Sequence, residues 1–169
     1  MRSINSRRFG RTLPVAAAAA MAVGVFFGAA VAQKNLSGKP TAAVYVMGDP
    51  EDREIVKTAV FNSLVRSGRY NMVAIDAIDL LTKEHIRQED KSSTIKIADY
   101  GKNAGAEWVC VVQITDRKGV TYINTRMIDV ETKTAAASHM DKMQDSEDLL
   151  EFIEKQIYLT LASLKASAK

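Results

Sequence analysis

The stretch Glu-Trp-Val-Cys-Val-Val-Gln-Ile, residues 107–114, decides the fold. It is the most hydrophobic strand-like run of the chain, and its β-branched and aromatic residues favour a strand in the core. Trp108 is interpreted as a buried anchor of this strand and not as a platform for sugar stacking. Cys110, the only cysteine, is interpreted as a small buried hydrophobic residue and not as a nucleophile.

Strand and helix patterns alternate before this run. Residues 41–47 form a β-prone stretch of the kind that is buried on both faces of a sheet. Asp49 and Pro50 then predict a helix start, because an aspartate accepts from free backbone N–H groups and a proline needs no partner in the first turn. Gly68 predicts the left-handed end of this helix. Six apolar residues at helical spacing predict its buried face: Ile55, Val56, Ala59, Val60, Leu64 and Val65.

The remaining elements complete an α/β pattern. Before residue 107, the sequence predicts a strand at 70–75, a short helix capped by Asp79, a polar surface loop at 87–93 and a helix at 94–104 followed by Gly105. After residue 114, it predicts a turn at 116–119, a strand at 120–129, a turn at 130–133, a strand at 134–139 and a helix from about Ser146. The order βαβααβββα predicts one α/β domain, residues 41–164, with a mixed sheet of 4–5 strands flanked by helices.

Charge is unevenly distributed along the chain. The 23 Lys and Arg residues exceed the 20 Asp and Glu residues, but residues 1–32 hold four arginines and no acid. Residues 33–169 therefore carry 19 basic and 20 acidic side chains, a net charge of −1. This balance argues against a nucleic-acid partner for the folded part of the chain.

Residues 1–32 have the pattern of an export signal. Four arginines precede an uncharged run at 13–32, which closes with Ala30-Val31-Ala32, small residues that a signal peptidase accepts. We therefore expect a bacterial, exported, periplasmic protein with a short linker at 33–40. The alternative is a membrane-anchored structural subunit that retains residues 13–32. Ser6-Arg7-Arg8-Phe9 only partly fits a twin-arginine signal, so the export route stays open, and without a cysteine near residue 32 we expect no lipid anchor.

Patterns that carry chemistry are sparse. Gly48 stands alone before the first helix, whereas a phosphate-binding loop needs several glycines. Asp76, Asp79 and His85 are clustered titratable groups, and they define the alternative hypothesis of a small periplasmic hydrolase. We interpret them as capping and solvated residues, and we expect no catalytic, metal or cofactor site and no enzyme activity.

Three stretches carry a resemblance to a known family. Residues 41–76 form a strand and a helix, followed by a strand that ends in Asp76. Residues 95–111 form a helix, a glycine and a strand. Residues 125–132 form a strand that ends in an Asp-Val-Glu-Thr turn, where Lys133 replaces the usual glycine. In this order they resemble the CsgG-type curli secretion-channel family and the related LpoB-type penicillin-binding protein activators, whose fold is akin to the TolB N-terminal domain.

The resemblance implies a non-catalytic binding or scaffold domain that acts in cell-envelope assembly, near the outer membrane. Its expected partner is an envelope protein, such as a penicillin-binding protein or a secretion component, and an oligomer is allowed. The connections are too short for the hairpins of a membrane pore. Sheet edges and the short helix with its polar loop are the expected protein-binding surfaces, with Leu80, Leu81, Arg87 and Tyr122 as candidate contacts.

Overall fold

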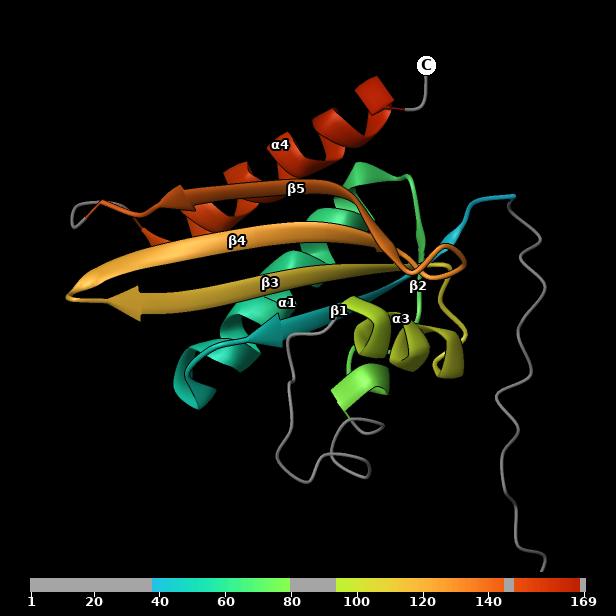
Figure 1. Cartoon of the computed structure of the whole chain (residues 1–169), viewed down its shortest axis with the longest axis horizontal. Helices are drawn as coiled ribbons and strands as arrows, with labels where there is room; N and C mark the ends of the chain where they lie inside the picture. The colour runs from blue at the N-terminus through green and yellow to red at the C-terminus, as the bar shows by residue number, and fades with distance from the viewer. Residues whose placement is uncertain (1–37, 80–93, 145–147, 168–169) are drawn as a thin grey trace, which may run out of the picture.

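The computed structural model describes residues 38–79, 94–144 and 148–167, which form a five-stranded mixed sheet with helices on both faces (Figure 1). The elements are β1 (Thr41–Met47), α1 (Pro50–Ser67), β2 (Asn71–Met72), α3 (Thr94–Asn103), β3 (Trp108–Arg117), β4 (Val120–Asp129), β5 (Thr134–Lys142) and α4 (Leu149–Ser167). The predicted α/β class and the mixed sheet are confirmed.

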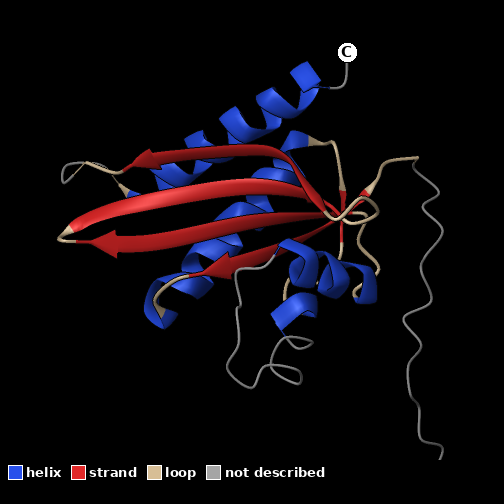
Figure 2. Cartoon of the chain, viewed as in Figure 1, coloured by secondary structure: helices blue, strands red, loops and turns tan. Residues whose placement is uncertain are grey.

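The sheet has the strand order β2-β1-β3-β4-β5. β1 pairs in parallel with both β2 and β3, whereas β3, β4 and β5 form an antiparallel meander. Figure 2 shows the three long strands of the meander beside the shorter β1. The hydrophobic run that opens β3 is therefore placed in the middle of the sheet, between a parallel and an antiparallel neighbour.

Two hydrophobic clusters lie on opposite faces of this sheet. On the face that we call the covered face, α1 and α4 pack against strand residues such as Val44, Cys110 and Met127. On the opposite face, α3 and Ile78 pack against a second group that includes Tyr45 and Val111. Cys110 is fully buried, as expected.

Trp108 is only partly buried. Its side chain packs against the cluster of the covered face as a peripheral member. The prediction of a core anchor is therefore only partly right, because β3 begins at this residue and its neighbour across the sheet, Asp129, ends β4.

α1 begins at Pro50 and ends before Gly68, which has a φ of +65°, as the sequence predicts. Its predicted apolar face is divided in two. Val56, Val60 and Leu64 are fully buried, whereas Ile55 and Val65 are 57% and 50% exposed. A helix buries only one stripe against a sheet, so the apolar residues on either side of that stripe remain in solvent.

Both turns of the meander use positive φ angles. Lys118 and Gly119 have φ values of 56° and 74°, and they connect β3 to β4 as a two-residue hairpin of the type that matches strand twist. Lys133, which stands where the resembling family has glycine, has a φ of 56°. Its ammonium group lies 2.7 Å from Asp99 of α3.

Several predicted boundaries are wrong. The strand expected at 70–75 is only the two-residue β2, and the helical backbone near Asp79 begins at Ala77, so Asp79 lies inside the first turn and does not precede it. α4 begins at Leu149 and not near Ser146, because the Asp148 carboxylate accepts from the backbone N–H groups of residues 150 and 151. β3 and β5 each end three residues later than predicted, because pairing with β4 extends strands whose own pattern has become polar.

Some predictions fall outside the described residues. They are the export signal at 1–32, most of the linker, the end of the short helix and the polar loop at 87–93. Within the described residues, no helix combines the length and the hydrophobicity that crossing a membrane requires.

Candidate functional site

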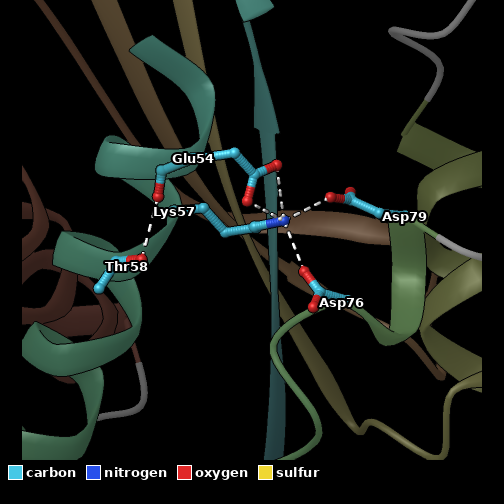
Figure 3. A network of polar contacts seen from close by, with 5 residues as sticks. All are labelled: Glu54, Lys57, Thr58, Asp76 and Asp79. Carbon is cyan, nitrogen blue, oxygen red and sulfur yellow. Dashed lines mark hydrogen bonds and ion pairs between the residues drawn. The ribbon is translucent and has the colours of Figure 1, made fainter. Parts of the chain in front are cut away.

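A buried lysine organises the ionisable groups near β1. Lys57 projects from α1, and its side chain is 2% exposed. Its ammonium nitrogen lies 2.7 Å from Asp76 Oδ1, 2.7 Å from Asp79 Oδ2 and 3.0 Å from Glu54 Oε2 (Figure 3). Glu54 comes from the preceding turn of α1, whereas both aspartates come from the segment after β2. The three carboxylates together engage all the donors that an ammonium group offers.

The surroundings of Lys57 hold it in the charged form. Burial by itself would lower the pKa of Lys57, but hydrogen bonds to Asp76, Asp79 and Glu54 outweigh burial and raise the pKa above its usual value. A lysine that serves as a nucleophile or base needs a lowered pKa instead. The Lys57 network is therefore a structural ion cluster, in which Asp79, with a side chain 14% exposed, is the most buried acid.

The network changes the interpretation of Asp76 and Asp79. The structure brings both carboxylates together, as the hydrolase hypothesis requires, but they converge on Lys57 and leave it no free donor. His85 lies outside the described residues. Among the described residues, no three His, Cys, Asp or Glu side chains form a group suited to a metal ion.

Sequence reasoning missed Lys57, although a signal was available. Lys57 is spaced by three and seven residues from Val60 and Leu64, so it lies on the buried side of α1. A lysine at such a position is almost never fully buried without partners. Its presence there indicates that carboxylates from elsewhere in the chain must approach the helix.

A second feature is the part of the sheet that no described helix covers. α3 lies across one end of the strands, and the β3–β4 hairpin extends well beyond it (Figure 1). Strand register places ten side chains together on this uncovered part, which we call the open face. They are Gln113, Thr115, Arg117, Val120, Tyr122, Asn124, Arg126, Ser138, Met140 and Lys142.

Charge is segregated between the two sides of the meander. Arg117, Arg126 and Lys142 share the open face, whereas alternation places Asp116, Asp129 and Asp141 on the opposite side. The strands thus contribute three cations and no acid to the open face. Met140, which is 66% exposed, and the partly exposed Tyr122 add apolar surface between these cations.

Arg126 is the most unusual residue of the open face. Its Nε and Nη2 atoms are buried and have no hydrogen-bond partner in the described structure. Burial lowers the pKa of Arg126 below its usual value. Nε and Nη2 lie along the same edge of the guanidinium plane, and two parallel donors in this arrangement match the two oxygens of a carboxylate.

A shallow groove lies between α1 and α4. Ile55 and Val65 of α1 and Leu150 of α4 line it, and an ion pair between Arg66 and Glu154 closes one side. The outer apolar residues of α1 therefore line this groove. Nothing in its lining identifies what would occupy it.

The sequence and the structure were compared with known proteins. No family model matches the sequence, and no curated protein matches it. Among solved structures, the chain is similar to the LpoB C-terminal domain from Salmonella enterica, at 14% identity and a TM-score of 0.48 over 63% of this chain and 83% of that one. It is also similar to lipoprotein GNA1162 from Neisseria meningitidis, at 11% identity and a TM-score of 0.47 over 73% and 96% of the two chains.

TolB from Acinetobacter baumannii is a further similar structure, at 14% identity and a TM-score of 0.46 over 78% of this chain and 28% of that one. At these identities we transfer no functional residue from any of the three proteins. The curli secretion-channel part of the sequence resemblance stays a prediction.

Of the four residues predicted to contact a partner, the structure describes only Tyr122. It lies on β4 within the open face, opposite Lys142 of β5. Leu80, Leu81 and Arg87 lie outside the described residues. The open face is thus the described surface that contains a predicted contact, and its role in binding stays a prediction.

Proposed function

We propose that residues 41–164 form a non-catalytic binding or scaffold domain that acts in cell-envelope assembly after export. The observation that carries the proposal is the Lys57 network. The acids that the sequence offers for catalysis, Asp76 and Asp79, are both bound to Lys57, whose raised pKa keeps it charged. These groups hold α1 against the segment after β2, and they are not left free for proton transfer.

The open face supports a binding role. An antiparallel sheet commonly packs one face on the core and leaves the other to solvent, but here the solvent side carries Tyr122 and Met140 next to cations without matching acids. Aromatic, methionine and arginine side chains are the types enriched where proteins contact one another. We propose this surface as the contact site for an envelope protein, in the manner of a penicillin-binding protein activator or a secretion accessory protein.

Site-specific photocrosslinking tests the proposal. A photoreactive phenylalanine derivative replaces Tyr122 in the full-length chain expressed in its own bacterium, and a matched chain carries it at Tyr158, which is 73% exposed on α4. We expect one envelope protein to crosslink at position 122 and not at 158. Equal capture at both positions, or none at 122, contradicts the proposal.

The identity of the captured protein refines the proposal. Recovery of a penicillin-binding protein favours the activator role. Recovery of only a second copy of the chain favours a ring-forming relative of the secretion channels.

A separate experiment tests whether the chain is exported and cleaved after residue 32. Mass spectrometry of the protein isolated from the cell envelope is expected to find Gln33 as the first residue. A chain that still begins before residue 13 supports instead the membrane-anchored structural subunit.

A further inference from the structure

We infer that the open face binds an acidic, extended segment of the partner protein, and that Arg126 anchors it by holding one carboxylate side-on. This inference rests on the proposed function, because it names the chemistry of the partner that the open face would contact. Arg126, the charge around it and the nearby apolar residues each support this inference.

Two donor atoms of Arg126 support its role as the anchor. Nε and Nη2 are the donors of one guanidinium edge, and neither has a partner in the described structure. Buried donors in folded proteins are nearly always satisfied, so a pair left open on one edge indicates a group that arrives from outside. The carboxylate of Asp or Glu fits this edge with two parallel hydrogen bonds, which a single-point acceptor cannot do. Both donor atoms are buried although the residue as a whole is partly exposed, so the proposed binding requires the Arg126 side chain to turn and bring this edge to the surface.

Arg117 and Lys142 add positive charge to the face that carries Arg126. Lys142 pairs with Tyr122, four residues from Arg126 along β4, and Arg117 pairs with Val120 at the hairpin. At ~3.4 Å per residue, Lys142 therefore lies about 14 Å along the strand direction from Arg126. An extended segment with acids four residues apart spans the same distance, and the strands place no acid on the open face to repel it.

The apolar residues of the open face favour a protein over a polyanion as the ligand. Met140 and Tyr122 lie among the cations, and they suit contact with side chains and backbone. Nucleic-acid binding depends on many phosphate contacts and a predominantly basic surface. The open face supplies only three cations, and residues 33–169 carry a net charge of −1.

The first experiment measures binding of a defined probe to the protein purified after export. The probe is a fluorescent ten-residue peptide of Ser and Thr with Leu at position 5 and Glu at positions 3 and 7; its matched control has Gln at both positions. We expect the Glu peptide to bind at least tenfold more tightly, with an affinity that falls as salt rises. Equal binding of the two peptides, or tighter binding of a single-stranded DNA decamer than of the Glu peptide, overturns the inference.

Two substitutions then test the anchor itself. Arg126→Lys keeps the charge but removes the side-on edge, and we expect it to weaken Glu-peptide binding at least fivefold. Arg66→Gln on α1 removes an exposed arginine from the other side of the sheet and should leave the affinity unchanged. Lys142→Gln, a change on the exposed end of β5, should weaken binding about twofold and reduce its salt dependence. Unchanged affinity in Arg126→Lys overturns the inference, whatever the effect of Lys142→Gln.

The outcomes separate this inference from the proposed function. If the crosslink at Tyr122 captures an envelope protein and Arg126→Lys leaves that capture intact, the acidic-segment inference fails while the binding role stands. If no partner crosslinks at Tyr122, the binding role fails as well. Thermal melting of each variant confirms that the compared proteins are folded.

Discussion

The two sides of β4 differ in burial and in the type of side chain that they carry. Ile123, Thr125 and Met127 point to the covered face and are fully buried. Their alternating neighbours Tyr122, Asn124 and Arg126 belong to the open face and remain partly exposed. Side chains on the covered face are mostly apolar and fill the space beneath α1 and α4. Side chains on the open face can be polar or charged, because no described helix packs on them. Residue-by-residue alternation thus separates a buried set of side chains from a partly exposed set within one ten-residue strand.

The largest expected effect tests the stability side of this comparison. Met127→Ala removes a fully buried side chain between β4 and the helices of the covered face, and we expect it to lower the free energy of unfolding by about 4 kcal/mol. The matched substitution on the other side of the strand, Asn124→Ala, should change it by less than about 0.5 kcal/mol. Guanidinium denaturation measures both, and similar losses would show that the open face is packed in solution.

A second substitution tests how the layers on the two faces are joined. Lys57→Ala leaves Asp79 largely buried without its cation, and we expect a loss of about 3 kcal/mol. Asp76→Asn removes a carboxylate whose side chain is 58% exposed and should cost less than about 1 kcal/mol. Urea denaturation of the two variants compares them, and equal costs would mean that the cluster contributes only as a surface ion pair.

A third prediction concerns alkaline pH. Burial raises the pKa of the Cys110 thiol from 9.0 to about 12, so the folded protein keeps a proton that the unfolded chain loses above pH 9. This contribution to stability is complete below pH 9 and is lost as the pH rises toward 12. The difference in free energy of unfolding between the native protein and Cys110→Ala should decrease by about 1.4 kcal/mol per pH unit in that window. Denaturation curves at pH 8 and pH 10 measure the change, and a constant difference would show that the thiol is not shielded.

The smallest expected effect concerns a polar defect on the covered face. Gln156 of α4 is fully buried, and neither its amide nitrogen nor its amide oxygen has a hydrogen-bond partner among the described residues. Gln156→Leu replaces these groups by apolar ones of similar size, so we expect a gain of about 1 kcal/mol. Thr160→Val, which removes the hydroxyl that bonds to the backbone oxygen of residue 156, should instead cost about 1 kcal/mol. Thermal melting distinguishes the two, and a destabilised Gln156→Leu would indicate that the amide is satisfied in solution.

Local patterns predicted much of the fold. β1 and β4 have the predicted bounds, and α1 begins at the predicted proline, because hydrophobic runs, caps and glycines act over a few residues. The two-residue length of β2 could not be predicted, because it depends on how far the chain stays beside β1 after Met72. The added length of β5 likewise depends on pairing with β4 and not on its own composition.

The candidate site was less accessible from the sequence. Asp76 and Asp79 were identified as a pair, but their partner Lys57 lies 19 and 22 residues earlier, and only the fold brings it to them. Tyr122 was identified without Arg126, because membership of the open face depends on strand parity and on where α3 ends. The Lys57 network and the open face both depend on contacts between distant segments, which local periodicity does not report.

The brevity of β2 gives the Lys57 network a further consequence. β2 pairs with β1 only at Thr41 and Ala42, and the Lys57 cluster joins α1 to the segment that carries Ile78, which packs with Tyr45 of β1. Beyond these positions no described strand pairs with this edge of β1, and an unpaired apolar strand edge is a template for pairing between molecules. The Lys57 cluster thus holds the segment with Ile78 beside the edge of β1. A variant without the cluster should aggregate, as fibrils or amorphous deposits, before its helices unfold.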